Sequence, residues 1–96
     1  MTYDIIYSII KNVKTILSKQ AKKYLDKIEK SDKKVYAKLL EGINDIENLN
    51  GDIKKLAGRD NEYRYKIFQY RIIFAPDFSN NEIFIKEIGI RGDIYK

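Results

Sequence analysis

The chain has 96 residues, a formal charge of +5 and a hydrophobic content of 44%, as expected for one small globular domain. It has no cysteine, which excludes disulfides and thiolate metal sites and fits a reducing cytosol, and no histidine, which excludes histidine acid–base chemistry and most zinc sites. The positive charge favours a polyanionic partner. The longest apolar run, residues 5–10, is too short to span a bilayer, so we expect no membrane segment.

Residues 1–12 are strongly apolar, but their pattern fits two structures. Some apolar residues alternate as in a strand, whereas others recur with the spacing of a helix. We expect this segment either to join the sheet or to cover an apolar face. The surplus of apolar residues also leaves room for a groove that accepts a partner's helix.

Two amphipathic helices are expected after a short strand at Val13–Leu17. Ser18 is a suitable N-cap for the first helix, Lys19–Glu29. Ser31 is expected to cap the second helix, and Gly51 is expected to stop it. The stripe of the second helix that we expect to be buried consists of Val35, Leu39, Leu40, Ile43, Ile46 and Leu49. The short polar link between the helices predicts an antiparallel pair.

Three strands are expected after Asp52–Asn61, which is predicted to be a loop. The predicted strands are Glu62–Phe68, Tyr70–Ala75 and Glu82–Ile88. Phe68 and Gln69 suit the turn of a hairpin, Pro76–Asn81 is a second turn, and Gly89 ends the last strand. This order predicts an α+β fold, with two antiparallel helices packed on one face of a small, twisted, mostly antiparallel sheet of about four strands.

Positive charge is concentrated in and beside the hairpin. From Lys54 to Ala75 the chain has six Lys and Arg against two acids, a net +4 that is most of the chain's +5. On an extended strand Tyr65 points to one face, whereas Arg64 and Lys66 point to the other with no acid between them. Because like charges on one face destabilise a hairpin, these two cations and Arg71 are candidates for binding a phosphodiester. The alternative is that they are solvated cations on the open face of the sheet.

Two further groups complete the candidate site. Arg91 follows the last predicted strand, in a C-terminal tail at Ile90–Lys96, and Tyr95 is able to stack on a base or transfer a proton. The alternative for both is a frayed terminus. The cations of the segment before the hairpin are expected to contact an RNA backbone, or to be solvated loop charges; they are Lys54, Lys55 and Arg59.

Several motifs follow one another in an order typical of one family. They are Leu56-x-Gly58, Tyr63-Arg64-x-Lys66-Ile67 and Tyr70-Arg71-Ile72-Ile73-Phe74, preceded by Val13–Leu25 and followed by Ile88–Lys96. This ordered set resembles the RelE/ParE toxin superfamily. The resemblance covers Val13 to Lys96 of a single domain at residues 1–96. Residues 1–12 are then an N-terminal extension, or a first strand followed by a longer helix.

The resemblance implies the RelE-like fold predicted above and a RelE-type function. Such a toxin enters the ribosomal A site and cleaves mRNA, using the RNA 2′-hydroxyl to attack the adjacent phosphate without a metal or cofactor. A cognate, RelB-like antitoxin silences the toxin in a cytoplasmic hetero-oligomer. In this sequence Arg71 and Arg91 would stabilise the transition state, and Arg64 and Lys66 would position the phosphate or assist proton transfer. Tyr95 would stack on a base or act as acid or base.

One residue departs from the family pattern. Ile90 stands where many relatives carry a histidine before the C-terminal arginine, so histidine-based chemistry is excluded. Some RelE-type members also lack this histidine and rely on Arg, Lys and Tyr. Two alternatives stay open: a ParE-like, non-enzymatic inhibitor of DNA gyrase, and a degenerate antitoxin-bound protein of the same fold. The presence of Arg71, Arg91 and Tyr95 favours the endonuclease.

Overall fold

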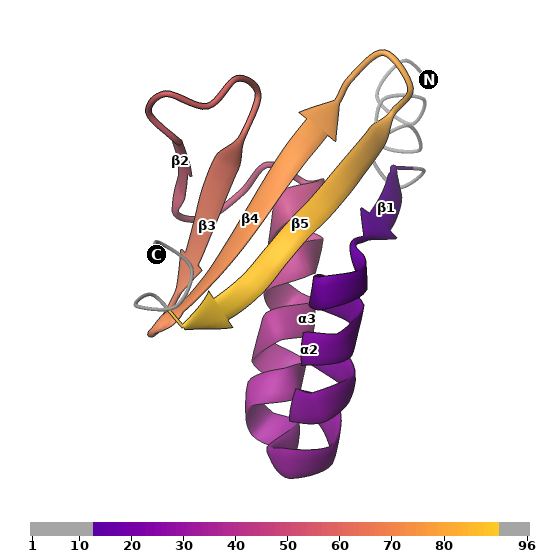
Figure 1. The fold of residues 1–96 in the computed structure, drawn as a ribbon, viewed down its shortest axis with the longest axis vertical. Coiled ribbons are helices and arrows are strands. Elements are labelled where there is room, and N and C mark those ends of the chain that lie inside the picture. Colours follow the sequence, from indigo (N-terminus) through magenta and orange to yellow (C-terminus); the bar gives the residue numbers. More distant parts are fainter. Residues whose placement is uncertain (1–12, 91–96) are drawn as a thin grey trace, which may run out of the picture.

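The computed structural model describes residues 13–90 and confirms the α+β fold (Figure 1). The predictions for residues 1–12 and for residues 91–96 lie outside the described residues. The elements are β1 (Lys14–Leu17), α2 (Lys19–Ser31), α3 (Lys33–Glu47), β2 (Ile53–Lys55), β3 (Tyr63–Ile67), β4 (Tyr70–Asp77) and β5 (Glu82–Ile90).

The sheet has five strands in the order β1-β5-β4-β3-β2, all antiparallel except for the β1–β5 pair. The prediction of about four strands missed β2, which lies inside the segment predicted to be a loop. In this strand Ile53 pairs with Tyr65, and Lys54 pairs with Arg64. A three-residue strand with one apolar residue and two lysines carries no detectable alternation, so only its partner in the sheet reveals it.

The predicted cap of the first helix is confirmed, whereas that of the second is off by one residue. The Ser18 Oγ accepts a hydrogen bond of 3.0 Å from the Ala21 N–H. The α2 helix continues to Ser31, and Asp32 caps α3 instead, because its carboxylate accepts a hydrogen bond of 3.2 Å from the Val35 N–H. Both caps satisfy N–H groups that have no partner inside the helix.

The end of α3 also differs from the prediction. The helix stops at Glu47 rather than at Gly51, with Asn48 as its C-cap. Leu49, which we predicted to be buried, is 53% exposed, and Leu40 on the same predicted stripe is 43% exposed. The rest of the stripe, including the fully buried Leu39 and Ile46, packs towards the sheet as predicted.

The two long strands extend beyond their predicted ends. Pro76 lies within β4 opposite Ile83, and Gly89 lies within β5 opposite Arg71. Because β3 pairs with β4 only as far as Phe74, Pro76 lies where β4 has one neighbour, a position that tolerates the missing N–H. Proline and glycine therefore did not end these strands, since the antiparallel partner continued the ladder. The two-residue turn at Phe68-Gln69 is as predicted.

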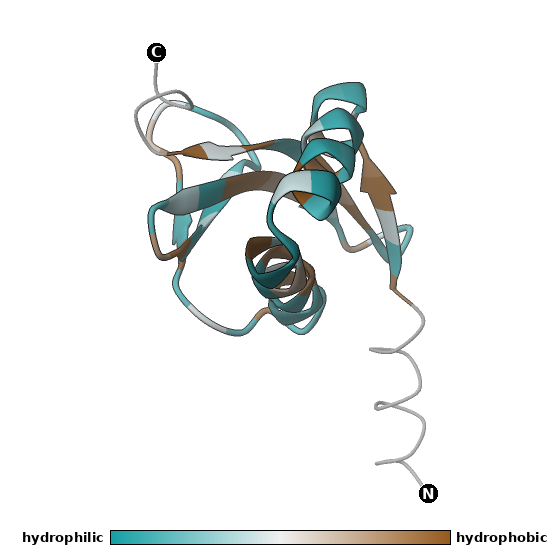
Figure 2. Ribbon diagram, turned by 90° about the horizontal axis from the view of Figure 1, so that it is seen from below, coloured by the Kyte–Doolittle hydropathy of each residue, from teal (hydrophilic) through white to brown (hydrophobic). Residues whose placement is uncertain are grey.

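The core lies between the two helices and one face of the sheet. Figure 2 shows hydrophobic residues in the strands and on the inner sides of the helices, with hydrophilic residues on the outer helix surfaces. The fully buried large side chains are Leu39, Ile46, Ile72, Phe74, Ile85 and Ile88. The start of α2 also covers the edge of β5 beyond β1, because the Gln20 amide bonds both the N–H and the C=O of Ile88, at 2.9 and 2.8 Å.

Tyr65 connects β3 to α3 at the centre of this core. A Cβ added to Gly42 of α3 would lie 2.9 Å from the Tyr65 ring, and one added to Gly51 would lie 2.7 Å from it. The Tyr65 hydroxyl donates a hydrogen bond of 2.6 Å to the Asp45 Oδ2. Burial and this hydrogen bond raise the pKa of Tyr65 to about 12. The Tyr65 ring therefore fits only because positions 42 and 51 have no side chain, and the Tyr65 hydroxyl stays protonated at neutral pH.

The close approach of α3 to Tyr65 predicts that Gly42→Ala destabilises the protein. Alanine favours a helix by roughly 1 kcal/mol over glycine, but the added methyl group overlaps a ring held on its other side by Gly51. We expect the free energy of unfolding, measured by urea denaturation, to fall by about 1–3 kcal/mol. Asn44→Ala, at an exposed position of the same helix, is the matched control and should not destabilise the fold. A Gly42→Ala protein as stable as this control would contradict the packing.

The raised pKa of Tyr65 predicts a specific pH dependence of stability. A group whose pKa is higher in the folded state stabilises the fold fully below its unfolded pKa, here about 10. That contribution is lost as the pH rises towards about 12. Tyr65→Phe removes the contribution and the bond to Asp45, so we expect it to be less stable than wild type at pH 8, and the difference to shrink from pH 10 to 12. An unchanged difference over this range would contradict the hydrogen bond to Asp45.

Candidate functional site

The sheet register brings four of the predicted cations together on the face opposite the helices, which we call the open face. Because Tyr65 points to the helices, the neighbouring Arg64 and Lys66 point to the open face. Lys54 pairs with Arg64 across β2 and β3, and Lys66 pairs with Arg71 across β3 and β4. We call Lys54, Arg64, Lys66 and Arg71 the cation cluster.

Arg71 is the most buried charged residue of the described part, with 6% of its surface exposed. Its Nη1 donates hydrogen bonds to the carbonyl oxygens of Phe68, at 3.2 Å, and Tyr70, at 3.0 Å. Among residues 13–90 neither Arg71 nor its neighbour Lys66 forms an ion pair. Two adjacent cations without a carboxylate between them repel each other, so this pair is suited to bind an anion.

Arg64 differs from its neighbours because it has a carboxylate partner. Its Nη1 donates to the Asp52 Oδ1 at 3.2 Å and to the Asp52 carbonyl oxygen at 3.3 Å. The sequence shows no acid between Arg64 and Lys66 on their strand face, and the partner of Arg64 comes instead from Asp52, the residue before β2. The contact fixes the direction of the guanidinium and lowers the net charge of the cluster.

Two of the predicted RNA-contacting residues lie away from the cluster. Lys55 pairs with Tyr63, so it lies on the opposite side of β2 from Lys54. The Arg59 guanidinium lies 3.3 Å from the Glu62 carboxylate, which also binds Lys86. A hydrogen bond from Lys86, together with the charges of Lys86 and Arg59, lowers the pKa of Glu62. Arg59 is thus already paired with an acid.

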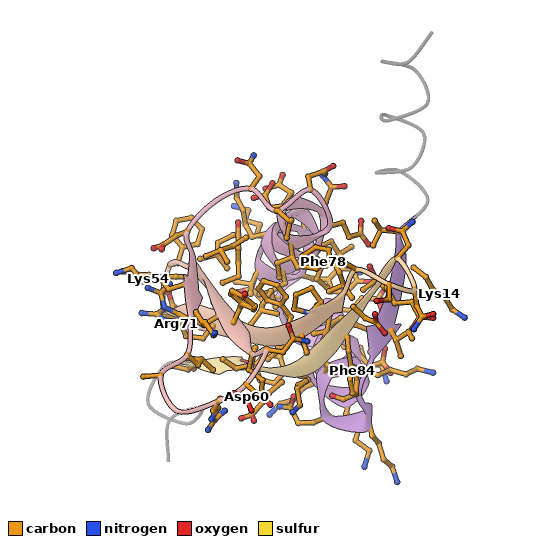
Figure 3. The ribbon with its side chains drawn as sticks, turned by 90° about the horizontal axis from the view of Figure 1, so that it is seen from above. Lys14, Lys54, Asp60, Arg71, Phe78 and Phe84 are labelled. Carbon is orange, nitrogen blue, oxygen red and sulfur yellow. The ribbon has the colours of Figure 1, made fainter. Side chains whose placement is uncertain are left out.

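The surroundings of Arg59 are acidic as well. A shallow hollow beside it is lined by Asp60, Glu62, Ile73, Lys86 and Glu87. Figure 3 shows Lys54 and Arg71 on one side of the sheet and Lys14 and Phe84 on the other. The cation cluster therefore lies on the Lys54–Arg71 side, whereas the Arg59 hollow combines Arg59 and Lys86 with three acids and has no excess of positive charge.

The last two predicted site residues, Arg91 and Tyr95, lie outside the described residues. The described part ends at Ile90, whose partner in β4 is Tyr70, and the preceding Gly89 pairs with Arg71. The described part of β5 thus ends one residue after the strand position beside Arg71.

Two features of the open face were missed from the sequence. One is Asp52, whose role depends on a strand that carries no sequence signal. The other is an apolar area at the far end of the face, where Ile16 is 38% and Phe84 is 41% exposed. The alternation of the buried Ile83 and Ile85 was a usable signal for Phe84, since it places the intervening residue on the open face.

Neither helix of the described part is both long and apolar enough to cross a membrane. Within residues 13–90, no three Asp, Glu, His or Cys side chains are grouped in a way that could hold a metal ion.

Comparison with known proteins gives one family and several related folds. A sequence profile described as the ParE toxin of the type II toxin–antitoxin system parDE matches residues 15–95. Among curated protein sequences no match is found.

The related solved structures are toxin–antitoxin complexes. The RelB–RelE complex of Methanococcus jannaschii matches with a TM-score of 0.65 and 23% identity over 84% of this chain and 95% of that one. The RelE–RelB complex of Pyrococcus horikoshii OT3 matches with a TM-score of 0.65 and 26% identity over 82% and 94%. The YoeB–YefM complex of Staphylococcus aureus matches with a TM-score of 0.68 and 21% identity over 83% and 98%.

The profile match spans nearly the whole chain, and the solved structures share its fold over most of their own length. Both findings agree with the order of motifs in the sequence. The chain therefore belongs to the ParE toxin family, within the RelE/ParE superfamily of toxins from type II toxin–antitoxin systems.

Proposed function

We propose that this toxin is a ribosome-dependent mRNA endonuclease that acts in the A site without a metal or cofactor. The observation that carries the proposal is the Lys66–Arg71 pair, two adjacent cations on the open face that form no ion pair with any carboxylate of residues 13–90. Such a pair is costly for the fold alone and is relieved by an anion such as an RNA phosphate.

The proposed reaction is an internal transfer within the RNA. The 2′-oxygen attacks the adjacent phosphorus and loses its proton, and the bond from phosphorus to the 5′-oxygen breaks as that oxygen takes up a proton. The products are a 2′,3′-cyclic phosphate and a 5′-hydroxyl. Negative charge builds up on the non-bridging oxygens during this step, so fixed cations stabilise the transition state.

The cation cluster supports distinct roles for its members. Arg71 is held by two carbonyl oxygens in a buried position, which suits a cation that must be in place before charge develops at phosphorus. Lys66 is exposed beside it and would position the phosphate or assist proton transfer. Arg64, oriented by Asp52, and its neighbour Lys54 would hold the RNA backbone next to the reacting phosphate.

The C-terminal residues complete the proposal. Arg91 is the residue after Ile90, at the end of the strand that pairs with Arg71 and Tyr70. We propose that Arg91 shares the stabilisation of the transition state with Arg71, and that Tyr95 stacks on a base or transfers a proton. A tyrosine needs nearby cations to lower its pKa before it can act as a base at neutral pH.

We also propose a cognate antitoxin as the physiological partner. The solved relatives from Methanococcus jannaschii, Pyrococcus horikoshii and Staphylococcus aureus are each in complex with an antitoxin, RelB or YefM. By analogy this toxin would form a hetero-oligomer with a RelB-like antitoxin in the cytoplasm, where its ribosome and mRNA targets are found.

One observation favours a second candidate, a non-enzymatic inhibitor of DNA gyrase. The matching profile is that of ParE toxins, and Ile90 stands where many RelE-type toxins carry a histidine. On this alternative the cation cluster would have no catalytic role. Substitutions in the cation cluster therefore distinguish the two functions.

The endonuclease proposal predicts that Lys66→Gln strongly reduces mRNA cleavage. Removing one donor to a developing oxyanion typically costs a factor of about 10² in rate. We expect a loss of this size in a purified translation system with a defined codon in the A site, read by primer extension. Lys30→Gln, in the last turn of α2, removes the same charge away from the sheet and should cleave like wild type.

Two outcomes would contradict the endonuclease. The first is wild-type protein that leaves ribosome-bound mRNA intact at micromolar concentration. The second is inhibition of gyrase supercoiling that Lys66→Gln does not weaken, which would support the ParE-like alternative. Arg71→Lys provides a further check, because it keeps the charge but loses the planar guanidinium. Since Arg71 is buried, circular dichroism must show that the variant protein still folds.

A further inference from the structure

A groove of about 250 Å³ lies between the end of α3 and the β4–β5 turn, away from the cation cluster. Its apolar lining is formed by Val13, Leu49, Phe78 and Ile83. Leu49 is 53% and Phe78 is 73% exposed, so the groove leaves two large apolar side chains open to solvent. Its volume is below the range of about 300–1,000 Å³ usual for small-molecule pockets and suits a few aliphatic side chains. We call it the Leu49 groove.

Leu49 occupies a strained backbone position at this site. The Leu49 N–H donates to the Ile46 carbonyl and the Asn50 N–H to the Asp45 carbonyl, which is the Schellman arrangement of a helix end. The residue after the C-cap is usually glycine in this arrangement, because it adopts a left-handed conformation. Here that residue is Leu49, with φ +52°. An exposed leucine at a strained backbone position adds no stabilising burial of apolar surface unless another segment covers it.

The segment attached to the groove has the matching chemistry. Residues 1–12 join the described part at Val13, which itself lines the groove, and the β1 strand begins beside the β4–β5 turn (Figure 1). Ile9 and Ile10 stand four and three residues before Val13, within reach of the groove at up to about 3.5 Å per residue. The segment lies outside residues 15–95, which the family profile matches.

We propose that residues 1–12 bind in the Leu49 groove of their own chain, with Ile9 and Ile10 covering Leu49 and Phe78. The charges agree with this occupant. The rim carries Glu47, Asp77 and Glu82 and no basic residue. Lys11 follows the two isoleucines directly, so it is delivered to an acidic rim.

The absence of cysteine allows a direct test by cross-linking. Two double variants, Ile9→Cys/Leu49→Cys and Ile10→Cys/Leu49→Cys, should each form an intramolecular disulfide under mild oxidation. The readouts are migration as a compact monomer on a non-reducing gel and the mass of the linked peptide. Ile9→Cys/Lys38→Cys is the matched control, because Lys38 is exposed on α3 nine residues before Glu47, roughly 13 Å along the helix, and should not cross-link.

A stability cycle gives an independent readout. In the full chain Leu49→Gly should lower Tm, because the docked contact is lost. In an Ile9→Ser/Ile10→Ser background the same substitution should raise Tm, because it then only relieves the backbone strain. Each shift in Tm should be a few degrees, since about 1 kcal/mol corresponds to roughly 4–8 °C in a domain of this size. Phe68→Gly is the control: Phe68 is also exposed at positive φ but lies at the β3–β4 turn, so its effect should be equal in both backgrounds.

Three results would overturn the proposal. The first is the absence of any disulfide between either isoleucine position and Leu49. The second is a disulfide that forms only between chains, which would assign the groove to a second copy. The third is an effect of Leu49→Gly that is the same in both backgrounds.

Discussion

The packing of Tyr65 against α3 is the constraint on which the rest of the structure depends. Its ring fits against two glycines, Gly42 and Gly51, and its hydroxyl binds Asp45, so β3 has one register relative to the helix. Because side chains alternate along a strand, burying Tyr65 turns Arg64 and its neighbour Lys66 to the open face. A slip by one residue would bury two cations, which the core could not tolerate. The same contact that builds the core thus builds the candidate site.

The cation cluster is held together by the sheet rather than by its own interactions. Lys66 and Arg71 are opposite each other because β3 and β4 pair at that register, although their charges repel. The burial of the apolar residues on the other face of the same strands offsets this repulsion. Carbonyl oxygens hold Arg71, and Asp52 orients Arg64. Functional sites commonly concentrate such unfavourable arrangements, and an anionic ligand relieves them.

The two ends of the molecule have different chemistry. The end that carries Lys54 and Arg71 is cationic, and the end that carries the β4–β5 turn is apolar with an acidic rim. A segment that covers Leu49 would remove exposed apolar surface without approaching the cations. If residues 1–12 bind there as proposed, they would cover apolar surface at one end and leave the cation cluster at the other end uncovered.

Local patterns in the sequence determined both helices, the hairpin with its two-residue turn, and the face on which Arg64 and Lys66 lie. These features follow from spacings of two or about 3.6 residues and from caps such as Ser18, which depend only on neighbours in the chain. Only the tertiary structure decided that Ile53–Lys55 forms a fifth strand, that Pro76 lies inside β4, and that Asp52 neutralises Arg64 while Lys55 points away. The reason is physical: a periodic pattern specifies which face a residue occupies, whereas its partner on that face is chosen by pairing between distant segments.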